Sequence, residues 1–173
     1  SAASDVYKRQ TLDAQLEDHP KQDEIAIIRD ETDEVHRALP KLKGREKGLA
    51  HRDIQRNKKE IRRLENEMIQ SVLENAEVIC STNIGSGHRM LDGRRFPIVL
   101  MDEATQAVEP SSLIPISKGC RQLILVGDHK QLPPTVISRK AEQEGLGRSL
   151  FERLIDVGIQ PKLLDVQYRI CLL

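Results

Sequence analysis

Aromatic residues and cysteines are scarce in this sequence, and neither sign of charge is in excess. Its 173 residues contain no Trp, two Tyr and two Phe, so each aromatic ring is valuable packing. The three cysteines, Cys80, Cys120 and Cys171, have no spacing suited to zinc, and their odd number suggests reduced thiols, with Cys80 expected in the core. No stretch approaches the roughly 20 apolar residues of a membrane-spanning helix, so no membrane is expected among the partners.

Charge is balanced overall but unevenly distributed along the chain. Lys and Arg together number 27, as do Asp and Glu, so the average field does not indicate a nucleic-acid binder. Acids outnumber bases nine to two over residues 11–34, and bases outnumber acids ten to three over residues 41–63. We interpret this asymmetry as two helices that attract each other, and a basic surface that touches a phosphate backbone is the alternative.

A helical hairpin is predicted before residue 76. Over residues 45–75 apolar side chains recur at spacings of three and four, which predicts one long helix with a single apolar stripe. The stripe consists of Ile61, Leu64, Met68 and Val72. Residues 23–39 offer a matching face, formed by Ile25, Ile28 and Val35. Pro40 and Gly44 fall between the two segments and are the helix breakers expected at a turn.

Two carboxylates follow a short apolar run, Ile-Val-Leu-Met at residues 98–101. Four apolar residues in a row fit a strand that is covered on both faces, as in a parallel α/β sheet. Ligands gather at the carboxyl ends of such strands, which is where Asp102 and Glu103 stand. In phosphoryl-transfer sites the first acid holds Mg²⁺, and a neighbouring group positions the attacking water. The pair alone is weak support, because any apolar strand can end in solvated acids.

A second apolar run, residues 122–126, leads into Gly-Asp-His-Lys-Gln-Leu-Pro-Pro at residues 127–134. Gly127 permits close backbone approach and the two prolines fix φ, so this loop should be stiff. A stiff loop can hold the amide of Gln131 near a γ-phosphate, whereas His129 is interpreted as structural. Two parallel strands are therefore predicted to point polar groups at one crevice.

Four motifs in this order resemble the superfamily 1 helicases of the nonsense-mediated-decay helicase group, whose relatives include the immunoglobulin-mu-binding and senataxin types. They are Asp-Glu-Ala-Thr-Gln-Ala (residues 102–107), Gly-Asp-His-Lys-Gln-Leu-Pro-Pro (127–134), Ser-Leu-Phe-Glu-Arg-Leu (149–154) and Val-Gln-Tyr-Arg (166–169). The resemblance implies an α/β fold class: a partial RecA-like P-loop NTPase motor domain, with a parallel sheet flanked by helices, preceded by a helical stalk hairpin. Many members insert a small β-barrel between the stalk helices, and the turn here is too short to hold one.

The resemblance also implies the cofactors, ATP and Mg²⁺, and the residues that contact them. Asp102 corresponds to the Mg²⁺ ligand, and Glu103 to the base that orients water. Gln131 corresponds to the glutamine that senses the γ-phosphate. Tyr168 is implied to stack on adenine, and Arg169 to contact the γ-phosphate, a role that suits the planar donors of a guanidinium.

A further polar segment follows a run that reads as another buried strand, residues 77–82. The segment is Asn-Ile-Gly-Ser-Gly, and glycines after a strand let backbone N–H groups approach phosphates. In the resembled family a loop at this position grips single-stranded RNA or DNA, so Thr82, Asn83 and Gly85 are the candidate nucleic-acid contacts. Taken alone, the segment is equally an ordinary flexible turn, and it lacks the lysine of an ATP phosphate loop.

Three segments are expected along the chain. Residues 1–10 resemble translated adaptor sequence, residues 11–76 form the stalk hairpin, and residues 77–173 form the C-terminal part of the first motor domain. A strand is expected at residues 163–166, separated by a gap in the sheet from the strand at residues 122–126. The Gly-x-x-x-x-Gly-Lys-Ser/Thr phosphate loop occurs nowhere in the sequence. We therefore expect an internal fragment that is inactive when isolated.

The function predicted for the intact parent is that of an ATP-dependent helicase or translocase acting on single-stranded RNA or DNA, with RNA favoured. A monomer with regulatory protein partners, in the cytoplasm or the nucleus, is expected. Two alternatives belong to other classes. One is a degenerate, non-catalytic scaffold that binds nucleic acid or a partner, and the more remote one is a metal-dependent hydrolase that uses Asp102, Glu103 and His129.

Overall fold

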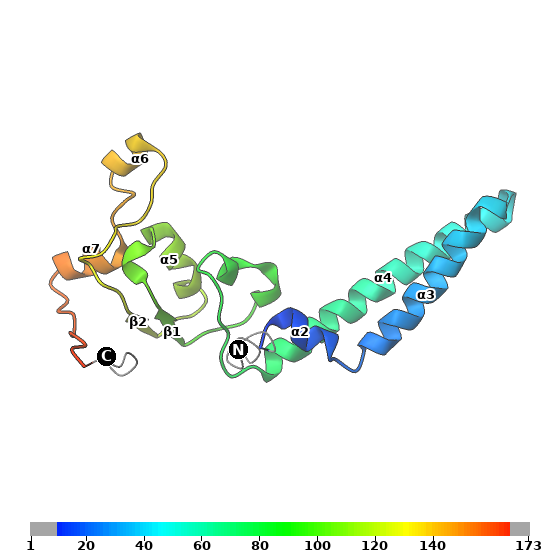
Figure 1. Ribbon diagram of the computed structural model, residues 1–173, viewed down its shortest axis with the longest axis horizontal. Coiled ribbons are helices and arrows are strands. Elements are labelled where there is room, and N and C mark those ends of the chain that lie inside the picture. The colour runs from blue at the N-terminus through cyan, green and yellow to red at the C-terminus, as the bar shows by residue number, and fades with distance from the viewer. Residues whose placement is uncertain (1–9, 167–173) are drawn as a thin grey trace, which may run out of the picture. The chain divides into compact units, whose positions relative to one another are not determined.

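The chain divides into two compact units, Ser1–Cys80 and Ser81–Leu173, of which the computed structural model describes residues 10–166 (Figure 1). Residues 1–9 of the predicted adaptor tail lie outside the described residues, as do Tyr168, Arg169 and Cys171. Within residues 10–166, no helix is long and apolar enough to cross a membrane. The two units are taken in turn.

The first unit is a helical hairpin (Figure 1). Its elements are α2 (Leu12–Glu17), α3 (Gln22–Ala38), the 3-10 turn η1 (Leu39–Lys41) and α4 (Gly44–Asn75). Pro40 lies in η1 and Gly44 takes a positive φ of 53°, so the chain reverses where the helix breakers were predicted. The predicted pair of helices is therefore confirmed, whereas α2 was not foreseen.

An apolar seam holds the hairpin together. Ile25 of α3 and Leu64 and Met68 of α4 are almost fully buried against each other. Leu16, Ile28 and Ile61 pack around them. Full burial of such a side chain contributes about 1.5–3 kcal/mol, so this seam stabilises the hairpin. Val72 and Val35, also predicted for the stripes, are only partly buried.

One buried polar contact crosses the same seam. The Asn57 amide donates to Thr32 Oγ1 at 3.1 Å, and the Thr32 hydroxyl donates to the Ile28 carbonyl at 2.7 Å. Both side chains are buried, so each needs the other as a partner. The contact fixes how far one helix slides along the other.

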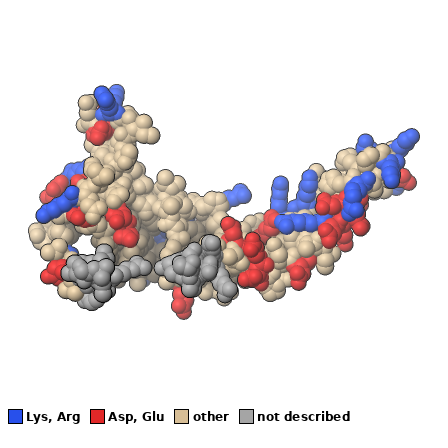
Figure 2. Space-filling view, viewed as in Figure 1, with Lys and Arg blue, Asp and Glu red and all other residues tan. Residues whose placement is uncertain are grey.

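The ion pairs between the two helices run opposite to the polarity we predicted. Lys21, at the start of α3, contacts Glu67 of α4 at 2.5 Å, and Arg29 contacts Glu65 at 2.9 Å. The basic partners, Lys21 and Arg29, belong to the acidic segment 11–34. The acidic partners, Glu65 and Glu67, follow the basic segment 41–63. The acids of residues 11–34 and the bases of residues 41–63 are instead exposed to solvent. Figure 2 shows charged side chains along the surface of the hairpin. The two ion pairs thus do not join the acids of residues 11–34 to the bases of residues 41–63, and the attraction between these two segments stays a prediction.

The second unit combines short helices with a small parallel sheet. Its elements are the 3-10 turns η2 (Gly85–Gly87) and η3 (Arg89–Leu91), β1 (Ile98–Met101), the 3-10 turn η4 (Ala104–Gln106), α5 (Glu109–Ile116), β2 (Gln122–Leu125), α6 (Arg139–Gln143) and α7 (Leu150–Asp156). β1 and β2 pair in parallel, in a register that places Ile98 opposite Gln122 and Met101 opposite Leu125. The two strands predicted to end at one crevice are therefore confirmed as neighbours.

Only one face of β1 is covered, which corrects the prediction of a strand buried on both faces. Val99 and Met101 are buried, whereas Ile98 and Leu100 are 61% and 62% exposed. Val99, Met101 and Ala104 form the core of the unit, packed against Phe96, Ile116, Cys120, Leu123, Leu125 and Phe151. A run of apolar residues thus marks the strand correctly but not the number of layers that cover it.

Two predicted strands do not form. Residues 77–82 are extended without strand pairing, and Cys80, expected in the core, is exposed. Residues 163–166 are also irregular, with Leu163 83% exposed, so the predicted gap between two strands does not arise. A strand requires a neighbour that satisfies its backbone donors and acceptors, and in residues 10–166 the sheet consists of β1 and β2 alone.

The helix α7 is fastened to the segment that follows β1. Ser149 caps the helix in a capping box with Glu152, and its backbone forms an isolated bridge with Val108. Arg153 of α7 donates to both carboxylate oxygens of Glu109, at 2.9 and 2.8 Å. The Ser-Leu-Phe-Glu-Arg-Leu motif therefore holds the end of the loop that follows β1, residues 102–108, which we call the acid loop.

Candidate functional site

The two acids stand at the carboxyl end of β1, as the sequence predicts. Asp102 follows the last strand residue, and its Oδ1 accepts a hydrogen bond from the Glu103 backbone N–H at 3.0 Å. Glu103 has φ 51° and ψ 38°, the one left-handed backbone outside glycine among the described residues. Strain of this kind persists only where the surroundings enforce it, and it clusters at functional sites. Both side chains are exposed and accessible to a ligand.

The backbone around the acids is fixed by the neighbouring strand. Ala104 N–H donates to the Val126 carbonyl and Val126 N–H to the Met101 carbonyl, both at 2.8 Å. Gly127 then passes so close to Thr105 that a Cβ on the glycine would lie 3.1 Å from the Thr105 backbone nitrogen. The glycine is therefore required for close approach, as predicted, and the neighbour that it approaches is the acid loop.

The loop after β2 is organised by Asp128. Its carboxylate accepts the Lys130 backbone N–H at 2.9 Å and the Gln131 side-chain amide at 3.3 Å. These donors, the Lys130 N–H above all, hold the pKa of Asp128 below its usual value. Gln131 N–H also donates to the Asp128 carbonyl at 3.0 Å. Together with the buried Pro134, these contacts give the loop the fixed shape expected of it.

A groove lies between the acid loop and the loop after β2, residues 127–134, which we call the glutamine loop. It has a volume of about 330 Å³ and is lined by Gln106, Lys130, Gln131, Leu132 and Pro133. Gln106 in turn donates from its side-chain amide to Glu103 Oε2 at 3.1 Å. Gln106 thus links the predicted site residues Glu103 and Gln131. Sequence reasoning missed both Gln106 and Lys130, although the three-residue spacing from Glu103 to Gln106 is that of a single 3-10 turn.

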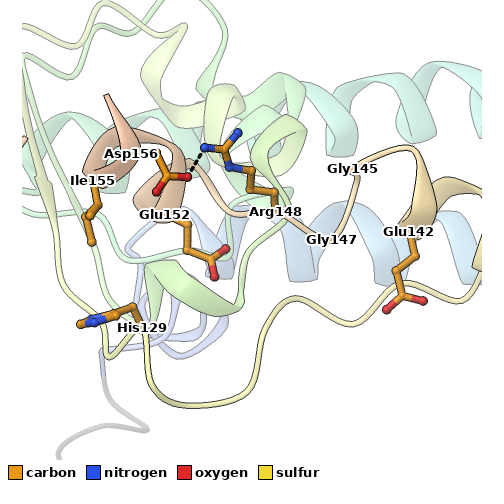
Figure 3. A pocket seen from close by; sticks show the side chains of 8 residues that line it. All are labelled: His129, Glu142, Gly145, Gly147, Arg148, Glu152, Ile155 and Asp156. Atoms are coloured by element: carbon orange, nitrogen blue, oxygen red, sulfur yellow. Dashed lines mark hydrogen bonds and ion pairs between the residues drawn. The ribbon is translucent and has the colours of Figure 1, made fainter. Parts of the chain in front are cut away.

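A larger hollow, of about 530 Å³, lies between the loop after β2 and the segment from α6 to α7 (Figure 3). His129 borders it, and inside it Arg148 pairs with Asp156 (Figure 3). The predicted reactive residues Asp102, Glu103 and Gln131 do not line it. Of the three, Gln131 lines the smaller groove, and the structural role of His129 stays a prediction.

The predicted nucleic-acid residues form a compact turn. Thr82 Oγ1 accepts the Gly85 N–H and the Thr82 carbonyl accepts the Ser86 N–H, both at 3.0 Å. A Cβ on Gly87 would lie 3.0 Å from the Ile114 side chain, so the turn packs on α5. The Gly85 and Ser86 N–H groups are therefore engaged inside the turn, whereas the Thr82 side chain is exposed.

The acids suit magnesium better than a metal held by protein alone. Within the described residues no three His, Cys, Asp or Glu side chains gather into a metal site. Mg²⁺ is usually held by one or two carboxylates, with waters and substrate phosphates completing its shell. An exposed carboxylate such as that of Asp102, at the end of a parallel strand, fits this arrangement. Tyr168 and Arg169, implied to contact the nucleotide, lie outside the described residues.

Comparisons with known proteins agree on one family. A family model described as an AAA domain matches residues 2–139. The chain is 50% identical over 131 residues to the "ATP-dependent helicase NAM7" of Saccharomyces cerevisiae, covering 76% of the chain and 13% of that protein. It is 45% identical over 139 residues to a "Regulator of nonsense transcripts 1 homolog" of Arabidopsis thaliana, covering 80% of the chain and 11% of that protein. The chain thus spans a small part of the length of these relatives.

Proposed function

This chain belongs to the AAA domain family, within its group of nonsense-mediated-decay helicases, and from that premise we propose that it forms the magnesium-binding and γ-phosphate-sensing part of an ATP-dependent RNA helicase. The proposed fold is a RecA-like P-loop motor domain, of which β1, β2 and their loops are one portion. One observation supports the proposal. Two paired parallel strands lead at their carboxyl ends into the loops that carry Asp102 and Glu103 on one side and Gln131 on the other.

Each residue has a proposed role. Bound ATP would supply the phosphoryl group, and bound Mg²⁺ the charge that neutralises it. Asp102 would hold the metal through its exposed carboxylate, and Glu103 would orient the attacking water. Gln131 would contact the γ-phosphate from a loop that Asp128 keeps rigid. For Tyr168 and Arg169, which lie outside the described residues, the proposed contacts with adenine and the γ-phosphate rest on the resemblance to the helicase group alone.

The proposed second ligand is single-stranded RNA, contacted by the turn that contains Thr82, Asn83 and Gly85. Relatives named as regulators of nonsense transcripts support RNA over DNA. Gly85 permits the tight turn, because a Cβ there would lie 2.9 Å from Thr82 Oγ1. We propose that the exposed hydroxyl of Thr82 and the partly exposed amide of Asn83 contact the sugar-phosphate backbone.

The experiment compares Glu103→Gln with Asp102→Ala in the full-length protein that contains this chain. Glu103→Gln should abolish ATP hydrolysis and leave ATP affinity within about twofold, because only the orientation of water is lost. Asp102→Ala should weaken Mg²⁺-dependent ATP binding as well. Gln143→Ala, at an exposed position on α6, serves as the matched control.

Two outcomes would contradict the proposal. Hydrolysis by Glu103→Gln at the parental rate would remove Glu103 from the reaction. RNA binding without any ATP turnover in the unmodified full-length protein would instead favour a non-catalytic scaffold.

A further inference from the structure

The side chain of Gln106 makes a specific contact that none of the predicted roles explains. Its Nε2 donates to Glu103 Oε2 at 3.1 Å, and its backbone N–H donates to the Glu103 carbonyl at 3.0 Å. The side chain is exposed, so it contributes little to the core. It also lines the groove that contains Gln131. Gln106 therefore touches both halves of the proposed site.

The backbone explains why these two side chains meet. Glu103 lies in the left-handed region, and the chain then enters the 3-10 turn η4. In a 3-10 helix residues three apart lie one above the other, which places Gln106 over Glu103. The intervening Ala104 and Thr105 are 2% and 3% exposed and anchor the turn in the core. The turn is thus anchored in the core by Ala104 and Thr105, while the exposed Gln106 amide lines the groove and contacts the Glu103 carboxylate.

We propose that Gln106 is a positioning residue for Glu103, an inference that rests on the proposed role of Glu103 in orienting water. The amide holds Oε2 and leaves Oε1 to accept a hydrogen bond from the attacking water. An exposed glutamate side chain would otherwise sample several rotamers, and only some of them point at the reacting phosphate. Holding one of them places the acceptor before the reaction, and such preorganisation raises kcat rather than ATP affinity.

The shared groove adds a second consequence. Gln106 and Gln131 line the same groove, so a γ-phosphate contacted by Gln131 would be bound beside the side chain that also holds Glu103. Gln106 is the one described residue that both lines this groove and donates a hydrogen bond to Glu103. Its replacement should therefore affect turnover even where nucleotide and RNA binding are intact.

The test uses Gln106→Ala and Gln106→Glu in the full-length protein, with Gln143→Ala as the matched exposed glutamine. Gln106→Ala should lower kcat for RNA-stimulated ATP hydrolysis about 10- to 100-fold, less than the roughly 10²- to 10⁴-fold that a positioned proton-transfer group contributes, because Glu103 itself remains. The KM for ATP should stay within about twofold of the parent. Gln106→Glu keeps the shape of the side chain but cannot donate when ionised. At pH 8 it should be at least as slow as Gln106→Ala.

The split between kcat and KM separates positioning from a structural role. A variant that only disturbs the local fold should change ATP affinity together with kcat, whereas the loss of positioning should lower kcat alone. A kcat for Gln106→Ala equal to that of Gln143→Ala, or a KM for ATP raised as much as kcat is lowered, would overturn the inference.

The variant Glu103→Gln tells the two proposals apart. If it hydrolyses ATP normally, the proposed function fails and the role of Gln106 fails with it. If it is inactive while Gln106→Ala is normal, only the positioning role is lost. If both are impaired, the double variant should be no slower than Glu103→Gln alone, since residues that act through one another are not additive. Additive losses would count against the inference.

Discussion

Replacing Gly127 with alanine should disturb the contact between the acid loop and the glutamine loop. The added Cβ would lie 3.1 Å from three atoms of Thr105, namely its backbone nitrogen, Cγ2 and Oγ1. The side-chain atoms can rotate away, but the nitrogen belongs to the core-anchored turn η4. Overpacking of this kind costs about 1–3 kcal/mol.

Amide hydrogen exchange can measure this loss of stability at the residues that join the two loops. The Ala104 and Val126 N–H groups donate across the junction between the two loops, so their protection measures how often it opens. Since each 1.4 kcal/mol is tenfold, Gly127→Ala should speed their exchange about 5- to 150-fold. Far-ultraviolet circular dichroism would miss the change, because the hairpin dominates the helical signal.

Gly48 supplies the matched control. It lies inside α4 with nothing within 4 Å of an added Cβ, so Gly48→Ala should stabilise the hairpin by about 0.5–1 kcal/mol. The double variant Gly127→Ala with Thr105→Ala removes two of the three close atoms and should restore part of the protection. Unchanged exchange at Ala104 and Val126 in Gly127→Ala would refute the reasoning.

Two further predictions concern stability. Arg153 holds Glu109 chiefly through hydrogen bonds, which lower the pKa of the Glu109 carboxyl. The pair therefore stabilises the fold at any pH above the ordinary glutamate pKa. This stabilisation is lost as the pH falls through the lowered pKa. Glu109→Gln should accordingly show a smaller loss of melting temperature between pH 7 and pH 3 than the parent, and an identical acid profile would contradict this. Asn57→Ala should destabilise the hairpin by about 1–3 kcal/mol in urea unfolding, because the Thr32 hydroxyl loses a buried partner, whereas Asn57→Leu combined with Thr32→Val should be nearly neutral. A loss in the double variant as large as in Asn57→Ala would contradict that account.

Local patterns predicted some elements well, for reasons visible in the structure. The stripe in α4 was readable because a helix repeats every 3.6 residues, so side chains such as Leu64 and Met68 must share one face. The position of Asp102 and Glu103 was readable because apolar residues end where β1 leaves the core. The stiff loop at Gly127 was readable from residues that restrict the backbone themselves.

Other features depend on partners that a local pattern does not contain. Residues 77–82 have the composition of a strand but no neighbouring strand, and the ion pairs of Lys21 and Arg29 do not join the two charge blocks of the hairpin. Gln106 looked like an ordinary polar residue until the left-handed backbone of Glu103 set the direction of the turn. Chain spacing suggested the turn but not the hydrogen bond.

The sequence by itself determined the hairpin, the two parallel strands and the placement of acids and glutamine at their ends, because helical periodicity, apolar runs and restricted residues act over a few neighbouring positions. Only the tertiary structure decided which face of β1 is covered, which charges meet between α3 and α4, and that Gln106 joins Glu103 to the groove of Gln131. These outcomes depend on which side chains arrive from distant parts of the chain, and burial, ion pairing and hydrogen bonding are properties of both partners.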